Sequence, residues 1–314
     1  MIERRALLTM AVLGLMPSAA FAQSAPGAGV PSPEHIDLWP AGAMETPPAG
    51  LAEKIATIGL AGVIAPRLEV LRPPPASNRH RAVLLIPGGS YQNLVVNKAP
   101  VDMAHFLLSR GFTVCMLIYR LPGEGWSQRG IASLQDAQRA MRLMRARAAD
   151  WGVDPDKIGA VGFSAGGHLA GMLTSRPGVA LYGPPDAIDA LPCRPAYTGL
   201  CYPVVTMDPT FTHAHSRANL IGEHPSDADV LAFSNERQVA KDASPTFIAV
   251  AADDETVPVA NSIAMFSALK AAQVPAELHV FEQGGHGFGV APPTTAASWP
   301  DLFMRWRDRH DPLA

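Results

Sequence analysis

The pentapeptide Gly162-Phe163-Ser164-Ala165-Gly166 constrains the fold of this chain more than any other stretch. It matches the G-x-S-x-G pattern of a nucleophile elbow, in which a serine sits on a sharp turn between a strand and a helix. Residues 157–163 predict a short buried strand, with small and apolar residues from Ile158 up to the serine, and residues 165–175 predict a helix. Flanking glycines remove the Cβ atoms that would clash in such a turn. The sequence therefore predicts an exposed, nucleophilic Ser164 at the carboxyl edge of a sheet.

Candidate partners for this serine follow downstream in the order acid, then histidine. The pair Asp253 and Asp254 comes directly after one predicted buried strand, and His286 comes after the next, in a glycine-rich stretch. Parallel strands deliver the residues at their carboxyl ends to one crevice, so these side chains are expected to meet Ser164. Serine needs an imidazole to take its proton, and the imidazole needs a carboxylate to fix its tautomer.

We therefore predict Ser164 as nucleophile, His286 as general base and then acid, and Asp254 as the orienting acid. The string D-x-x-V-P, which starts at Asp254, favours that residue, with Asp253 kept as the alternative. The alternative that His286 is an ordinary loop histidine is disfavoured by the glycines around it.

A glycine-rich turn predicts the third part of such a site, an oxyanion hole. The apolar run 82–86 leads into Pro87-Gly88-Gly89-Ser90-Tyr91. Glycines allow backbone N–H groups to point toward a developing negative charge, and such donors often make the largest catalytic contribution. We predict that the N–H groups of Gly89, Ser90 and Ala165 form the hole.

Alternation of strand and helix patterns predicts an α/β fold with a mostly parallel central sheet flanked by helices. The expected strands are 67–72, 82–86, 112–119, 157–163, 197–205, 246–251 and 276–281, and the expected helices are 99–110, 131–150 and 165–175. Apolar residues of helix 131–150 follow helical spacing, and its arginines and Asp136 are expected on a solvated face.

Several longer strings carry a family resemblance. They are LWP (38–40), PGGSYQNL (87–94), the segment 136–170, SRANLIG (216–222), the segment 253–270 and GGHGFG (284–289). From about Ile36 to about Arg309 the chain resembles the bacterial acetylxylan-esterase-like branch of the α/β-hydrolases, which includes feruloyl-esterase-like relatives. The resemblance implies an α/β-hydrolase fold and a secreted, cofactor-free esterase that removes acetyl or similar short acyl groups from plant cell-wall sugars such as acetylated xylan.

One residue departs from that family pattern. Ser90 stands where the family usually has a third glycine. The backbone donor survives this change, while the added side chain narrows the acyl pocket or adds a hydrogen bond. We therefore expect short acyl groups, acetate above butyrate, to be preferred.

The first 22 residues read as a signal peptide, with Arg4-Arg5, an apolar stretch and an A-x-A site that ends at Ala22. Residues 23–34 read as a flexible leader, and 35–314 as one domain. The protein is expected in the periplasm or outside the cell, by the ordinary secretory or the twin-arginine route, with no membrane anchor after cleavage. A net charge of −3 without a basic stripe argues against nucleic acid as a partner. The oligomeric state is not determined by the sequence.

Residues 206–241 lack a strand pattern and interrupt the sheet, which predicts a small cap or rim over the site. Tyr91, Trp126 and His215 are candidate substrate contacts, although Trp126 is equally well explained as a half-buried aromatic. His213 and His215 lie near Asp208 in sequence, but a further ligand at a recognisable spacing is missing, so no metal and no cofactor are predicted.

The remaining polar and sulfur residues are expected to be structural. His168 is expected to pack under the elbow, and Cys115 is expected as a buried free thiol. Cys193 and Cys201 could pair in an oxidising compartment, but only if the chain folds back between them.

Other function classes stay open at this stage. A broad-specificity carboxylesterase or feruloyl esterase would use the same three residues. A lipase would need an apolar lid, a peptidase would usually carry a large extra domain, and a dienelactone-type hydrolase would need cysteine at position 164. A binding protein on a degenerate version of the fold is disfavoured, because Ser164, Asp254 and His286 are all present.

Overall fold

A central sheet organises the molecule. The computed structural model describes residues 32–56 and 58–310. Within them the sheet has the strand order β1-β4-β6-β5-β7-β8-β9-β10. Its strands are β1 (Glu34–Asp37), β4 (Arg67–Leu71), β5 (Ala82–Ile86), β6 (Thr113–Ile118), β7 (Ile158–Phe163), β8 (Thr198–Cys201), β9 (Thr246–Ala251) and β10 (Ala276–Phe281). The six strands from β6 to β10 along this order are parallel, and β4 runs antiparallel to both β1 and β6. The predicted α/β class and mostly parallel sheet are confirmed.

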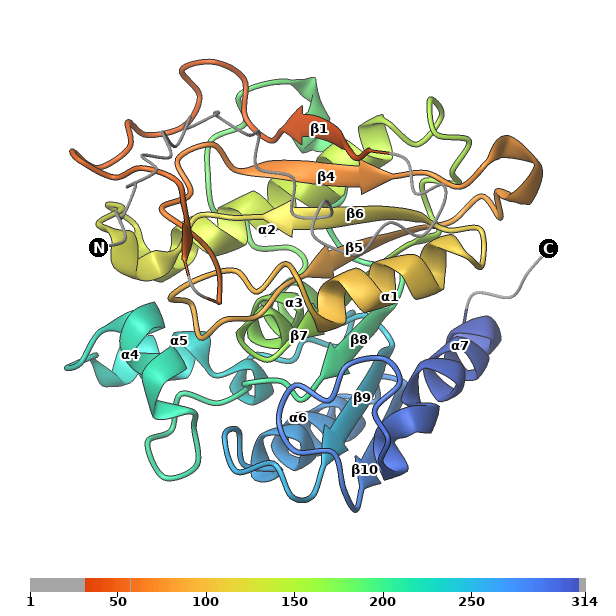
Figure 1. The fold of residues 1–314 in the computed structure, drawn as a ribbon. Coiled ribbons are helices and arrows are strands. Elements are labelled where there is room, and N and C mark those ends of the chain that lie inside the picture. The colour runs from red at the N-terminus through yellow and green to blue at the C-terminus, as the bar shows by residue number, and fades with distance from the viewer. Residues whose placement is uncertain (1–31, 57, 311–314) are drawn as a thin grey trace, which may run out of the picture.

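Helices cover both faces of this sheet (Figure 1). They are α1 (Ala99–Leu108), α2 (Arg129–Ala146), α3 (Ala165–Ser175), α4 (Ala214–Ile221), α5 (Asp227–Phe233), α6 (Ala260–Ala271) and α7 (Trp299–His310). α1 and α7 lie on one face, where Arg110 just after α1 reaches Asp301 of α7 at 3.2 Å, and α2 and α3 lie on the other. None of these helices is long and apolar enough to cross a membrane, as far as the described residues go.

β8 ends earlier than its apolar sequence predicts. The chain leaves the sheet after Cys201, and Tyr202 takes a positive φ of 38°. Beyond it, the N–H groups of Val205 and Thr206 donate to the side-chain oxygen of Asn261, at 2.9 and 3.2 Å, instead of to a neighbouring strand. A tertiary contact thus replaces the ladder that the run 197–205 would otherwise continue.

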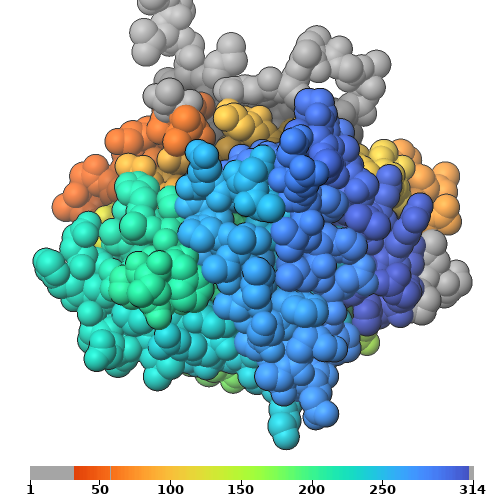
Figure 2. Space-filling view, turned by 90° about the horizontal axis from the view of Figure 1, so that it is seen from below, coloured from red at the N-terminus to blue at the C-terminus, as the bar shows by residue number. Residues whose placement is uncertain are grey.

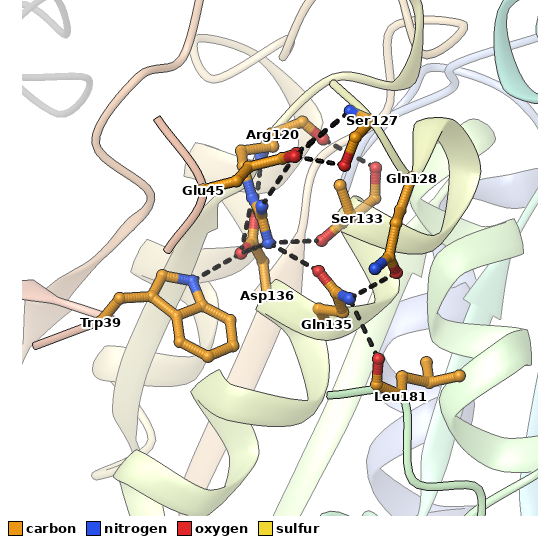
Figure 3. Close-up of polar contacts among 10 residues, drawn as sticks. Trp39, Glu45, Arg120, Ser127, Gln128, Ser133, Gln135, Asp136 and Leu181 are labelled. Carbon is orange, nitrogen blue, oxygen red and sulfur yellow. Dashed lines mark hydrogen bonds and ion pairs between the residues drawn. The ribbon is translucent and has the colours of Figure 1, made fainter. Parts of the chain in front are cut away.

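The expectation of a solvated polar face on α2 is wrong. Asp136 and Arg139 are buried, and Arg120, just beyond β6, is buried against them. The Arg120 guanidinium donates to Asp136 at 2.8 Å, and the Trp39 indole donates to the same carboxylate at 2.7 Å (Figure 3). The charges of α2 therefore join the N-terminal segment to the sheet, because a buried charge must be paired.

The excursion between β8 and β9 holds α4 and α5. Both helices lie at the edge of the sheet toward which the β5 and β6 arrows point in Figure 1. Seen from below, this segment lies beside the C-terminal part of the chain on one face of the molecule (Figure 2). A capping box of Ser226 and Asp229 starts α5. The placement suits the predicted rim, whose role stays a prediction.

Two further predictions concern the N-terminal segment and the cysteines. The predicted signal peptide and most of the leader lie outside the described residues, but Glu34 already belongs to β1 rather than to a flexible leader. All three cysteines are free and buried, so Cys193 and Cys201 do not form a disulfide. The Cys193 thiol instead donates to the carbonyl of Pro177 at 3.4 Å.

Candidate active site

The turn between β7 and α3 holds Ser164 in a strained conformation. Its φ of 54° and ψ of −119° are rare for a residue with a side chain. The Ser164 N–H donates to the carbonyl of Cys201 at 3.0 Å, and its own carbonyl accepts from Val204 at 3.1 Å. At Gly166 a Cβ would come within 2.2 Å of the Ile86 carbonyl oxygen, so only glycine fits there. The surrounding backbone therefore enforces the elbow geometry.

Ser164, His286 and Asp254 come together in a hydrogen-bonded chain. The Ser164 Oγ lies 2.9 Å from His286 Nε2, and His286 Nδ1 lies 2.8 Å from Asp254 Oδ2. The Asp254 side chain is completely buried, whereas that of His286 is one-fifth exposed. A carboxylate at Nδ1 fixes the tautomer in which Nε2 is free to accept the serine proton. The geometry suits proton transfer from Ser164, and the catalytic roles stay predictions.

The two adjacent aspartates bind different atoms. Asp254 uses its second oxygen to accept from the N–H groups of Thr256 and Val257, both at 2.9 Å. Asp253 does not contact the imidazole; one of its oxygens accepts from Gly284 at 2.9 Å and Gly285 at 2.7 Å. Asp254 therefore faces His286 directly, while Asp253 holds the loop that carries it.

The predicted oxyanion turn packs directly against the elbow. Gly89, Ser90 and Tyr91 all have positive φ values, of 126°, 57° and 59°. A Cβ on Gly88 would lie only 3.0 Å from the Cβ of Ser164. In the described part of the chain, the N–H groups of Gly89, Ser90 and Ala165 have no hydrogen-bond acceptor. Three donors left free beside the serine are what an oxyanion hole requires.

Two of the predicted substrate contacts point into the protein instead. Tyr91 is only 1% exposed, and its hydroxyl donates to His168 Nδ1 at 2.8 Å. Trp126 is 4% exposed, with the Arg120 guanidinium 5.2 Å from its ring centre. Neither ring offers a free face to a ligand, because each is covered by its own neighbours. The predictions that Tyr91 and Trp126 contact the substrate are corrected. His215, the third candidate, is exposed, and its Nε2 lies 3.1 Å from Gln92 Oε1.

His168 lies under the elbow, as its position in α3 predicts. Its Nε2 donates to the carbonyl of Phe233 at 2.7 Å, so its Nδ1 must accept the proton of the Tyr91 hydroxyl. Burial lowers the pKa of His168 to about 4, partly offset by its bond to Phe233. A neutral imidazole therefore links the oxyanion turn, the elbow helix and the end of α5.

Sequence reasoning did not place Tyr202 or His213 beside the triad. The ring of Tyr202 packs edge-on against His286, with 5.0 Å between ring centres, and was hidden inside a predicted strand. His213 lies close enough to His286 for their charges to interact, and burial together with that interaction lowers the pKa of His213. An aromatic residue at the carboxyl end of a strand was the available signal for Tyr202.

A metal site is not supported by the described residues, which contain no group of three metal-ligating side chains. His213 Nδ1 lies 2.8 Å from the Ser216 hydroxyl. Asp208 is engaged by Thr210 at 2.7 Å and by Arg237 at 3.2 Å.

Two sequence families match successive parts of the chain. The BD-FAE family matches residues 68–181, which carry the oxyanion turn and the elbow. The prolyl oligopeptidase family matches residues 200–310, which carry Asp254 and His286.

Individual relatives agree with these matches. An endo-1,4-beta-xylanase B of Butyrivibrio fibrisolvens is 32% identical over 69% of this chain and 34% of its own length. An acetylxylan esterase of Xylanibacter ruminicola is 30% identical over 76% of this chain and 45% of its own. The chain thus spans less than half the length of these two curated relatives.

A solved structure is similar over its whole length. The acetyl ester-xyloside bifunctional hydrolase of Caldicellulosiruptor lactoaceticus is 30% identical, with a TM-score of 0.76. The match covers 92% of this chain and 100% of that one. The two proteins therefore share the same overall fold.

Proposed function

Because this chain belongs to the acetylxylan-esterase-like branch of the α/β-hydrolases, we propose that it is a serine esterase acting on acylated plant cell-wall carbohydrate. Its substrates are acetyl or similar short acyl esters, such as those of acetylated xylan. The observation that carries the proposal is the chain Asp254–His286–Ser164 beside three free backbone donors.

The first half of the reaction forms an acyl-enzyme. His286 Nε2 takes the Ser164 proton while the serine Oγ attacks the ester carbon, and the carbonyl electron pair moves onto its oxygen. The N–H groups of Gly89, Ser90 and Ala165 stabilise that oxyanion. When the carbon–oxygen ester bond breaks, His286 returns the proton to the departing sugar alkoxide. The sugar hydroxyl leaves, and the acyl group stays on Ser164.

The second half repeats these steps with water. His286 takes a proton from water, the resulting hydroxide attacks the acyl carbon, and the Ser164 Oγ leaves with the proton that His286 donates. The product is a free carboxylic acid such as acetate. Asp254 stabilises the imidazolium in both halves, because its carboxylate is buried against Nδ1.

The position of Ser90 supports a short acyl group. Its φ of 57° places a side chain in the turn that carries the donors, and Asn219 of α4 fixes that turn by donating to the Ser90 carbonyl at 2.9 Å. A side chain on this fixed turn, beside the reacting carbonyl, leaves less room for long acyl chains than glycine would. Export through the segment 1–22, with action in the periplasm or outside the cell, is part of the same proposal.

A parallel release assay tests the proposal. Acetate release from acetylated xylan, ferulate release from feruloylated xylan and hydrolysis of p-nitrophenyl acetate and butyrate are measured on the same preparation. We expect acetylated xylan and p-nitrophenyl acetate to be cleaved well and feruloylated xylan poorly. Equal rates on all four would favour a broad carboxylesterase, and a dominant ferulate signal would favour a feruloyl esterase.

A further inference from the structure

A hollow lies next to the oxyanion turn. It has a volume of about 620 Å³, and its wall includes Lys54, Ala56, Gln92, Asn93 and Glu124. The hairpin of β2 (Lys54–Ala56) and β3 (Gly59–Ala61) forms one side. The other side begins with Gln92 and Asn93, whose N–H groups both donate to the Gly89 carbonyl, at 2.9 and 3.1 Å. This pocket therefore starts within one turn of a predicted oxyanion donor.

The hairpin is fixed to that turn by backbone pairing. Leu60 and Leu94 exchange hydrogen bonds of 2.9 and 2.7 Å. The contact is so close that a Cβ on Gly59 would lie 2.2 Å from the Leu94 carbonyl oxygen. The wall is thus preformed, which lowers the cost of ordering it when a ligand binds.

The chemistry of the wall suits an uncharged, hydroxyl-rich ligand. Lys54 and Glu124 contribute opposite charges, and Gln92 and Asn93 add neutral amides. Glu124 accepts from the Gly62 N–H at 2.5 Å with one oxygen, and its other oxygen is buried without a hydrogen-bond partner among the described residues. Burial raises the pKa of Glu124, against the effect of the Gly62 bond. Apolar surface from Leu51 and Ile58 completes the lining, as the aliphatic face of a sugar ring requires.

A row of polar side chains leads from this pocket toward the catalytic histidine. Gln92 lies 3.1 Å from His215, whose ring centre is 6.4 Å from that of His213. His213 in turn is near enough to His286 for their charges to interact. A substrate whose ester lies at Ser164 can therefore extend along this rim into the pocket.

We propose that the pocket between the β2–β3 hairpin and the oxyanion turn binds the sugar chain that carries the ester, as a neutral xylo-oligosaccharide subsite. This inference rests on the proposed function and adds where its carbohydrate is held. Gln92 and the hairpin are then specificity residues, because they act on a sugar substrate but not on a small aryl ester, which does not reach them.

The hairpin itself offers a matched pair of variants. Side chains alternate along a strand, so Lys54 and Ala56 face the pocket while the exposed Ile55 points away from it. Ala56→Phe fills the pocket, and Ile55→Phe adds an aromatic ring on the opposite side. Gln92→Ala removes a polar part of the wall.

Two measurements on the full chain test the subsite: calorimetric titration with xylotetraose, and kinetics on acetylated xylo-oligosaccharides beside p-nitrophenyl acetate. We expect Ala56→Phe and Gln92→Ala to weaken xylotetraose binding and raise KM for the oligosaccharide about tenfold. The kcat/KM for p-nitrophenyl acetate should stay within about twofold, and Ile55→Phe should resemble the parent on both substrates.

The outcomes separate this inference from the proposed function. Parent-like binding and kinetics in Ala56→Phe would overturn the subsite while leaving the esterase proposal in place. Xylotetraose binding that Ala56→Phe abolishes, without acetate release from any sugar ester, would support the subsite and overturn the proposed substrate. A parent protein that does not bind xylotetraose would overturn the subsite.

Discussion

Two polar networks lie at the carboxyl edge of the same sheet, and they differ in how completely their polar groups are buried and paired. At the end of β7, Ser164, His286 and Asp254 form a chain that stays partly open, with His286 one-fifth exposed. Beyond β6, Arg120 and Asp136 are both buried and bind further groups from the N-terminal segment and α2. The first network keeps polar atoms available to bind a substrate, whereas most polar atoms of the second are already paired within the protein. The contrast predicts that changes in the first cost activity and changes in the second cost stability.

The largest expected effect is the loss of activity in Ser164→Ala. Turnover of p-nitrophenyl acetate should fall by about 10⁴- to 10⁶-fold, because the nucleophile is gone while the oxyanion donors remain. The free energy of unfolding in denaturant should change by less than about 1 kcal/mol. Turnover close to that of the parent would show that Ser164 is not the nucleophile.

The next largest effect is expected at the two aspartates, whose substitution should lower kcat to different extents. Asp254→Asn should lower kcat about 10⁴-fold, because an amide at His286 Nδ1 favours the wrong tautomer. Asp253→Asn should cost less than about tenfold, since its amide oxygen can still accept from Gly284 and Gly285. Steady-state kinetics on the same ester decide the ranking, and the reverse order would assign the orienting role to Asp253.

In the second network, Asp136→Asn should act on stability. Its removal leaves the buried Arg120 charge without its main partner, at a cost of about 3–5 kcal/mol in the free energy of unfolding. Activity per folded molecule should be unchanged. Glu45→Gln is the matched control: Glu45 is partly exposed and 3.9 Å from Arg120, so its change should cost less than about 1 kcal/mol. Equal effects of the two variants in denaturant titrations would contradict the contrast.

His168 makes the free energy of unfolding depend on pH. The folded state holds it neutral with a pKa of about 4, below the usual value of 6.5, so the unfolded chain binds its proton first as pH falls. Its stabilising contribution is full above pH 6.5 and is lost progressively toward pH 4. Between pH 7 and 4.5 the parent should lose about 2–3 kcal/mol more unfolding free energy than His168→Asn. Parallel pH curves of the two proteins would rule this out.

The smallest effect is expected at Ser90. A residue other than glycine in the left-handed backbone region costs about 1–2 kcal/mol of stability. Glycine would relieve that cost but gain unfolded-state entropy worth about 0.4–1 kcal/mol. Ser90→Gly should therefore be about 0.5 kcal/mol more stable in thermal and denaturant unfolding. It should also raise the kcat/KM for butyrate relative to acetate esters, and an unchanged ratio would remove Ser90 from the acyl wall.

Much of the fold and the chemistry could be predicted because short stretches determine them. β5, β9, β10 and α3 have the predicted bounds, since each is an apolar run between strong turn or capping signals. The elbow follows from steric limits within a few residues around Ser164. The placement of the acid and histidine follows from the rule that parallel strands end at one edge. These are local or topological constraints, and the sequence carries them on its own.

The tertiary structure alone decided which side chains are buried and what they bind. Asp136 looks solvated along α2, yet its partner Trp39 is 97 residues away, and no helical periodicity contains that contact. Tyr91 and Trp126 have the chemistry of substrate contacts but are covered by His168 and Arg120. Asp253 and Asp254 are adjacent and chemically identical, and only the folded paths of the loops after β9 and β10 determine which one faces His286. Burial and orientation depend on residues that meet only in the folded chain, whereas the elbow motif and the bounds of several strands depend on consecutive residues.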